Sequence, residues 1–272
     1  MFSIRQVAPA LLVLSTAAAA VPARAQSAME IVVNIPAGRL DVHQGGERIR
    51  SYPVSVGTAG HATPTGQAGI QRMVWNPSWT PPDSPWARDE RPAAPGWNNP
   101  MGRVKMHLFE DYYVHGTPAR NERFLGRPAS HGCIRMRNAD VMELARLVLT
   151  ADGAGVSEAT LDQLAANPGR TREMRLSGRV RVRIEYRLAE LEQDSVALHP
   201  DVYGRAGARY ADRVSQELTA LGQDASVVEQ MAIRRSPASA LRIARSGPAP
   251  IRQVPGVAMP AAAAVEVVAA LR

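Results

Sequence analysis

The alternation of apolar and polar residues predicts a β-rich first half of the chain. Between Glu30 and Gly57, apolar residues occupy every second position in several short runs, and Gly45-Gly46 separates two of these runs. Period-two runs broken by glycine are typical of strands joined by tight turns. We therefore expect a β-meander over residues 30–57. A turn at Thr63-Pro64-Thr65-Gly66 and a further strand over residues 70–74 follow it.

The same alternation returns further along the chain. Residues 104–108 alternate as a strand, and a second strand begins at residue 112 and has His115 at its end. The run from Val180 to Leu188 alternates apolar residues with arginine and glutamate. That pattern predicts a strand with one buried face and one face toward solvent.

Apolar residues at the spacing of an α-helix occur in the second half of the chain. Asn138 is suited to cap a helix from about Ala139 to Thr150, and Ser157 is suited to cap a second, short helix that reaches Ala166. Residues 208–234 predict one or two amphipathic helices. From Ser236 onward, alanine, proline and arginine dominate.

The segment from Trp75 to Gly102 interrupts this regular pattern, because it contains seven prolines and all four tryptophans. Proline excludes a regular helix or a central strand there. Two interpretations of the segment stay open, and both can hold. It is a lid or binding loop, as long loops in compact domains often are, or it wraps and staples the surface of a β core.

The N-terminus is typical of an export signal. Arg5 precedes an almost wholly apolar stretch over residues 7–21, and Ala23-Arg24-Ala25 has the small residues of a cleavage site. We expect a signal peptide over residues 1–25, cleavage near Ala25 and a periplasmic mature protein. An uncleaved anchor is the less favoured alternative, since about 15 apolar residues are short for a membrane span.

Composition narrows the class of protein. The chain has 272 residues, of which 45% are hydrophobic and 21% charged, and a formal net charge of +7. These values are ordinary for a globular protein and exclude a collagen, a heptad rod or a fully disordered chain. The basic tail is either a solvated segment or an arm attracted to an anionic polymer or lipid phosphate. Aromatic residues do not interleave with the basic ones, so we expect no nucleic-acid partner.

Cys133 is the only cysteine of the chain. A single thiol excludes an intrachain disulfide, a cysteine-based zinc knot and a CxxC redox pair. Exported proteins meet oxidising conditions, so an unpaired cysteine there is either buried and inert or kept for its reactivity.

The residues around this cysteine favour reactivity. A thiol attacks carbonyls as the thiolate and needs a nearby base or cation, and His115 and His131 both precede Cys133 by at most eighteen positions. If the turn that carries Cys133 folds back along the strand that ends at His115, the imidazole can reach the sulfur. Gly132 would let backbone amides face an oxyanion. Arg135 would favour the thiolate and suits a carboxylate ligand.

A zinc site made of the two histidines and the cysteine is the alternative for these residues. We disfavour it because the sequence shows no fourth ligand nearby.

The run HGT…SHGCIRM, which spans residues 115–136, resembles the signature of the L,D-transpeptidases, the YkuD-type cysteine enzymes of bacterial cell walls. Further features stand in the order typical of that family. They are the β-meander, the Thr63–Gly66 turn, Asn99-Pro100-Met101-Gly102, Asn138-Ala139-Asp140 at a helix start and the late strand followed by HPDVYG. The resemblance covers residues 29–204 and does not extend into residues 205–272.

The resemblance implies a mainly β fold with a few helices (α+β). We expect a β-sandwich of mixed sheets over residues 29–204, which includes the late closing strand, and a helical, then basic, C-terminal extension over residues 205–272. No cofactor and no metal are implied.

The resemblance also implies roles for individual residues. Cys133 would be the nucleophile, His115 the proton acceptor and donor, and the Gly116 carbonyl the group that orients the imidazole. The remaining four residues would bind substrate or shape the site. Among them, Arg135 would bind the terminal carboxylate of the donor or support the turn. These four residues are Ser130, His131, Gly132 and Arg135.

The implied reaction is attack on the third residue of a peptidoglycan tetrapeptide stem, release of D-Ala and transfer of the acyl group from a Cys133 thioester to an amine. The acceptor amine would lie on a second stem or on a lipoprotein, and carbapenems are expected inhibitors. Two alternatives remain: an L,D-carboxypeptidase or amidase that uses water as the acceptor, and a non-catalytic wall-binding protein.

Overall fold

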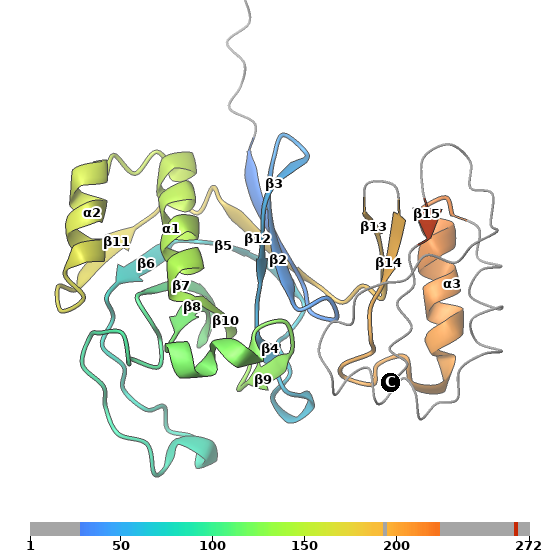
Figure 1. Ribbon diagram of the computed structural model, residues 1–272, viewed down its shortest axis with the longest axis horizontal. Helices are drawn as coiled ribbons and strands as arrows, with labels where there is room; N and C mark the ends of the chain where they lie inside the picture. Colours follow the sequence, from blue (N-terminus) through green and yellow to red (C-terminus); the bar gives the residue numbers. More distant parts are fainter. Residues whose placement is uncertain (1–27, 193–194, 224–263, 266–272) are drawn as a thin grey trace, which may run out of the picture.

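The computed structural model describes residues 28–192, 195–223 and 264–265 (Figure 1). The predicted signal peptide and most of the tail beyond residue 223 lie outside these residues, so both remain predictions. Among the described residues, no helix combines the length and apolar character that crossing a membrane requires.

The first sheet has five strands in the order β3-β2-β1-β12-β5. Its antiparallel meander confirms the one predicted from the sequence and consists of β1 (Met29–Asn34), β2 (Arg39–Gln44) and β3 (Glu47–Pro53). The late strand β12 (Arg181–Glu185) runs parallel to β1 and antiparallel to β5 (Gly66–Gly69). The sheet thus joins the two ends of the domain.

The second sheet also has five strands, in the order β10-β8-β7-β6-β11. These are β6 (Arg72–Trp75), β7 (Val104–Phe109), β8 (Tyr112–Thr117), β10 (Ile134–Arg137) and β11 (Arg172–Arg175). β8 and β10 are parallel, whereas the other neighbours are antiparallel. A short parallel pair, β4 (Val56–Gly57) with β9 (Pro128–Ser130), lies before the start of β10 in the chain.

One apolar core joins the two sheets and the helices α1 (Asn138–Asp152) and α2 (Glu158–Ala166). Met106, Val114 and Ile134 lie in register across the second sheet and are fully or almost fully buried. The fold class predicted from the sequence is confirmed: a mainly β domain of two mixed sheets with a few helices.

Successive side chains of a strand point to opposite faces of the sheet, so the residues next to these three point to the other face of the second sheet. Lys105, His115 and Arg135 lie in register across β7, β8 and β10 on that face. The sheet therefore presents apolar side chains to the core and a row of nitrogen-bearing side chains to the other side.

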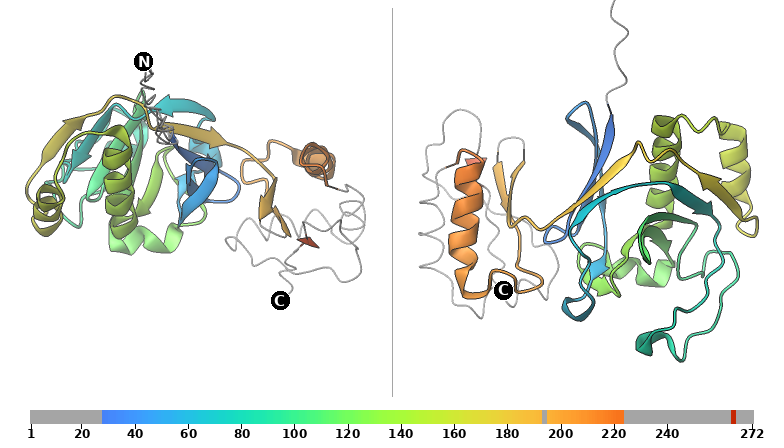
Figure 2. Two further views of the ribbon diagram at one scale, coloured as in Figure 1. Left: turned by 90° about the horizontal axis from the view of Figure 1, so that it is seen from above. Right: turned by 180° about the vertical axis from the view of Figure 1, so that it is seen from behind.

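The chain leaves this domain after β12 and forms a smaller layer (Figure 2). This layer contains the hairpin β13 (Ala189–Glu192) and β14 (Ser195–Leu198), the short β15 (Ala264–Val265) and helix α3 (Tyr210–Ala220). It has its own small core, which includes Leu188, Val196, Val214 and Leu218.

Local details differ from the predictions in two places. Asn138 is the first residue of α1 and not its cap, because its side-chain oxygen accepts the buried backbone N–H of Arg103 at 2.9 Å. The strand predicted over residues 180–188 ends at Glu185, where the chain turns toward the smaller layer. Ser157 caps α2 as predicted, since its side chain accepts the N–H of Thr160.

Candidate active site

The parallel pairing of β8 and β10 brings the predicted site residues close to one another. Arg135 of β10 lies opposite His115 of β8, and Cys133 comes directly before β10. The Cys133 thiol is half-buried and free, and its Sγ lies 3.5 Å from the carbonyl oxygen of Asp111, which precedes β8. His115 and Cys133 are 18 residues apart in the sequence, and the pairing of neighbouring strands brings their backbones near each other.

The turn before Cys133 is held by its own serine. Ser130 Oγ donates to the carbonyl oxygen of Cys133 at 2.6 Å and accepts the N–H of Gly132 at 3.0 Å. Gly132 has φ +111°, and a Cβ there would lie 2.7 Å from the ring of Tyr112. Glycine is thus required on both conformational and steric grounds. Ser130 and Gly132 shape the turn that carries the nucleophile.

Thr63 holds the same turn from outside. Its buried hydroxyl donates to the carbonyl oxygen of Gly132 at 2.7 Å and accepts the N–H of Gly57 at 2.9 Å. Tyr203 extends this network, because its hydroxyl donates to the carbonyl of Gly57 and accepts the N–H of Thr63. The Thr63–Gly66 segment and the HPDVYG segment, both noted in the sequence, therefore meet behind the cysteine turn.

His115 is almost wholly buried, with 3% of its surface exposed. Its Nδ1 lies 2.6 Å from the carbonyl oxygen of Gly116. A carbonyl only accepts, so Nδ1 carries the proton of the neutral ring, and the backbone of Met101 is a second hydrogen-bonding neighbour of the imidazole. Burial, followed by the charge of Arg135, lowers the pKa of His115 to about 3. The imidazole is consequently neutral at physiological pH and able to take a proton.

Gly116 is backed by a tightly packed turn. A Cβ at Gly116 would run into the side chain of Asn138, the backbone N–H of Arg103 and Gly102. The buried Arg103 side chain fixes this turn, since it donates to Asn76 and to the last carbonyls of α2. The Asn99–Gly102 motif of the sequence thus supports the carbonyl that orients His115.

The thiol itself is protonated at rest. Burial raises the pKa of Cys133, whereas the N–H of Tyr113 and the charges of Arg135 and Lys105 oppose that rise. The sequence predicts that Arg135 favours the thiolate. Arg135 does act in that direction, but burial outweighs it. Among the described residues, the sulfur hydrogen-bonds to the carbonyl of Asp111 and accepts from the N–H of Tyr113, and no hydrogen bond joins it to the imidazole.

Lys105 is a site residue that the sequence analysis missed. It lies opposite His115 on β7, as Arg135 does on β10, so two cations flank the imidazole. Burial, followed by the charge of Arg72, lowers the pKa of Lys105, and the cysteine is among the groups with which it interacts. One feature of the sequence could have drawn attention to Lys105: it is the single lysine among 32 basic residues.

Arg135 supports the turn in the structure. It is half-buried, and its Nη1 donates to the carbonyl oxygen of Ala129 at 3.1 Å. Burial lowers the pKa of its guanidinium. In the described residues, its printed hydrogen bond is to this carbonyl and not to a carboxylate.

His131 connects the cysteine turn to the proline- and tryptophan-rich segment. Its ring stacks on Trp86 with a centroid separation of 4.1 Å and an angle of 4°. His61, to which the sequence assigns no role, meets the same imidazole edge-on at 4.8 Å. Burial, then the charges of His61 and Arg135, lowers the pKa of His131.

The segment from Trp75 to Gly102 packs against both the cysteine turn and the β core. Trp86 stacks on His131 of the cysteine turn, and a role as a lid or binding loop stays a prediction. Trp75 is fully buried at the end of β6, and Trp97 packs against the guanidinium of Arg103 at 4.4 Å, as a surface wrap would. No three histidine, cysteine, aspartate or glutamate side chains of the described residues gather as metal ligands.

Comparison with known proteins gives the family. The model of the L,D-transpeptidase catalytic domain (YkuD) matches residues 28–176, more than half of the chain. A Fuscovulum blasticum protein that carries an L,D-transpeptidase name is 39% identical over 107 residues, which are 38% of this chain and 55% of that protein. "Probable L,D-transpeptidase ErfK/SrfK" of Escherichia coli is 34% identical over 128 residues, covering 42% of this chain and 39% of that protein. The matches thus span only about half, or less, of these relatives.

Solved L,D-transpeptidases resemble the chain more distantly. L,D-transpeptidase 3 from Mycobacterium tuberculosis matches with a TM-score of 0.39 and 15% identity over 58% of this chain and 61% of that one. The structure of LdtMt1 in complex with imipenem matches with a TM-score of 0.36 and 16% identity over 58% and 59% of the two chains. The assignment rests on the match over residues 28–176, and by that match the chain belongs to the family of L,D-transpeptidase (YkuD) catalytic domains.

Proposed function

We propose that this chain is an exported cysteine L,D-transpeptidase that acts on the tetrapeptide stems of peptidoglycan. The observation that carries the proposal is the state of His115. His115 is buried and neutral, and its Nδ1 is fixed on the Gly116 carbonyl. It lies on β8, next to β10, which begins directly after Cys133. A neutral, oriented imidazole beside a thiol is suited to general-base activation of a nucleophile.

The first half of the reaction forms the acyl-enzyme. The thiol leaves the Asp111 carbonyl and turns toward His115, whose Nε2 takes the proton as Sγ attacks the carbonyl carbon of the third stem residue. A C–S bond forms, and the carbonyl π electrons move to oxygen. When the oxyanion collapses, the bond to D-Ala breaks, and the proton on Nε2 passes to the departing amine.

The second half reverses these roles. An amine of a second stem or of a lipoprotein gives a proton to Nε2 and attacks the thioester, and the sulfur leaves and regains a proton. The raised pKa of Cys133 and the lowered pKa of His115 favour proton transfer during attack over a thiolate–imidazolium pair formed beforehand. The Gly116 carbonyl stabilises the imidazolium that forms transiently.

The cations beside the imidazole suit the substrate. Lys105 and Arg135 flank His115, and a stem peptide carries carboxylates that these side chains can bind. Trp86 and His131 add a stacked aromatic wall next to the cysteine turn. Solved relatives include complexes with imipenem and an avibactam carbamoyl enzyme, which supports the proposal that carbapenems acylate Cys133.

Product analysis tests the proposal. The mature chain is incubated with a purified disaccharide-tetrapeptide and the products are weighed by mass spectrometry. A cross-linked dimer with loss of D-Ala is the expected result, and Cys133→Ser is expected to abolish it while the fold survives. Tripeptide without dimer would instead establish the water-using carboxypeptidase.

A second measurement addresses the non-catalytic alternative. Incubation with imipenem is expected to add the mass of one inhibitor to the wild-type chain and none to Cys133→Ser. Absence of both adduct and product from a folded wild-type protein would contradict an enzymatic role.

A further inference from the structure

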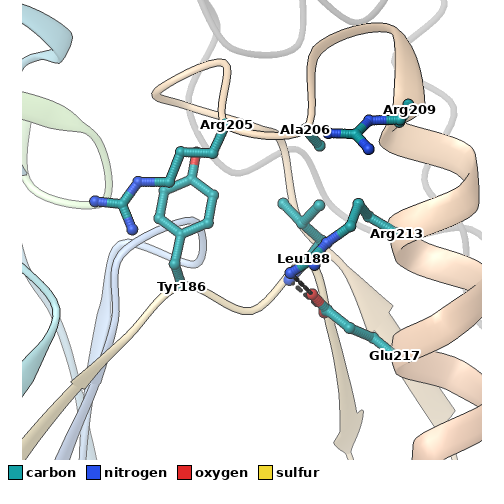
Figure 3. A pocket seen from close by; sticks show the side chains of 7 residues that line it. All are labelled: Tyr186, Leu188, Arg205, Ala206, Arg209, Arg213 and Glu217. Atoms are coloured by element: carbon teal, nitrogen blue, oxygen red, sulfur yellow. Dashed lines mark hydrogen bonds and ion pairs between the residues drawn. The ribbon is translucent and has the colours of Figure 1, made fainter.

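A second candidate site lies between the two layers, away from the cysteine. A cavity of about 230 Å³ is lined by Tyr186 and Leu188, where the chain leaves β12, and by residues before and along α3. Its charged lining residues are Arg205, Arg209, Arg213 and Glu217. Figure 3 shows Arg205 beside Tyr186 on one wall, and Arg209, Arg213 and Glu217 on the wall that α3 forms. Arg209 and Arg213 thus line the α3 side of the cavity, whereas the guanidinium of Arg205 lies against Tyr186 and extends away from α3.

The acidic residue of the cavity does not neutralise these arginines. Glu217 Oε2 accepts the backbone N–H groups of Leu188 and Ala189 at 2.7 and 2.9 Å. Its other oxygen is 3.9 Å from Arg213, a long contact between partly exposed side chains. The structure gives Arg205 and Arg209 no ion pair with any described residue. The lining therefore carries three positive charges and one negative charge that is already hydrogen-bonded.

The frame around the arginines is fixed. Asp201 accepts the hydroxyl of Tyr186 and the backbone N–H groups of Arg205, Ala206 and Gly207. These bonds hold the loop before α3 and also use the backbone donors there, so a ligand would meet side chains and not free amides. The guanidinium of Arg205 packs 4.4 Å above the ring of Tyr186, which limits the freedom that binding would remove.

We infer that this cavity, the Arg205–Arg213 pocket, binds a phosphate monoester. A guanidinium presents a planar fork of donors that matches phosphate and carboxylate oxygens. A single carboxylate has two oxygens in one plane and one charge. A phosphate monoester has three terminal oxygens and about two charges, so it can accept hydrogen bonds from the guanidinium groups of both Arg209 and Arg213. The Tyr186 ring and Leu188 offer an apolar surface to the group that the phosphate carries.

The test is a calorimetric titration of the mature chain with glycerol 3-phosphate at constant ionic strength, because screening would otherwise mask the effect. We expect saturable binding that the double variant Arg209→Gln/Arg213→Gln weakens at least tenfold. Each single variant is expected to weaken binding about threefold. Arg175→Gln is the matched control, since Arg175 is an exposed arginine of β11 at the far end of the molecule, and it should change the affinity less than twofold.

Three results would overturn the inference. They are no saturable binding by the wild-type chain, equal weakening by Arg175→Gln, and succinate binding as tightly as glycerol 3-phosphate. Thermal unfolding of each variant shows that its fold is retained.

Vesicles distinguish a soluble ligand from a lipid headgroup. Retention on phosphatidylcholine vesicles that contain phosphatidic acid, but not on those with equal phosphatidylglycerol, identifies a lipid monoester if the double variant loses it. Binding of glycerol 3-phosphate alone identifies a soluble ligand. Neither readout depends on peptidoglycan turnover, so failure here is distinct from failure of the proposed function.

Discussion

Thr63 offers the sharpest test of how the cysteine turn is held, through the substitution Thr63→Val. The change keeps the branched shape but removes the hydroxyl that bonds to Gly132 and Gly57. Both backbone groups are buried. A buried polar group left unsatisfied costs about 1–3 kcal/mol. Two such groups predict a loss of about 2–6 kcal/mol in the free energy of unfolding.

The substitution should also lower turnover. Gly132 directly precedes the nucleophile, and a displacement of about 1 Å at a reacting group can cost about 100-fold in rate. We expect kcat to fall at least tenfold while the chain remains folded at 25 °C.

Urea unfolding and transpeptidation are measured in parallel on Thr63→Val and on the matched control Thr63→Ser. Serine keeps the hydroxyl and loses one methyl group, which predicts a loss of about 1 kcal/mol and nearly unchanged turnover. If valine and serine destabilise the protein equally, the hydroxyl bonds do not hold the turn, and the reasoning fails.

Three further predictions concern the nucleophile and its base. Burial raises the pKa of Cys133, so the rate of alkylation by iodoacetamide should keep rising from pH 5 to above pH 9. Lys105→Gln should lower the rate at pH 8, and a plateau between pH 5 and 8 would indicate a preformed ion pair instead. His115→Ala should cost about 10²–10⁴-fold in turnover, as positioned acid–base groups do. A much larger loss in His131→Ala would reverse the assignment. A pKa of about 3 for folded His115, against 6.5 unfolded, means that its stabilisation is complete above pH 6.5 and falls with acid. By linkage, urea titrations should show a loss of about 2 kcal/mol between pH 7 and pH 5 that is absent from His115→Gln. An equal loss in that variant would show that other groups are responsible.

Much of the fold follows from local patterns. The alternation over residues 30–57 and 104–108 predicts strands that the structure contains, because a strand with one buried face needs an apolar residue at every second position. Ser157 was identifiable as a cap because its side chain acts within four residues. Asn138 was misassigned because its partner, Arg103, is 35 positions away.

The sequence by itself determined the composition of the candidate site: a sole cysteine, a histidine–glycine pair, and glycine where no Cβ fits. Tertiary structure decided which groups surround it and what charge they carry. Register between strands placed Lys105 beside His115, and long-range packing brought Thr63 to Gly132 and Trp86 to His131. Burial then set the proton on Cys133 rather than on His115. Desolvation and register depend on residues distant in the chain, and a local motif does not contain them.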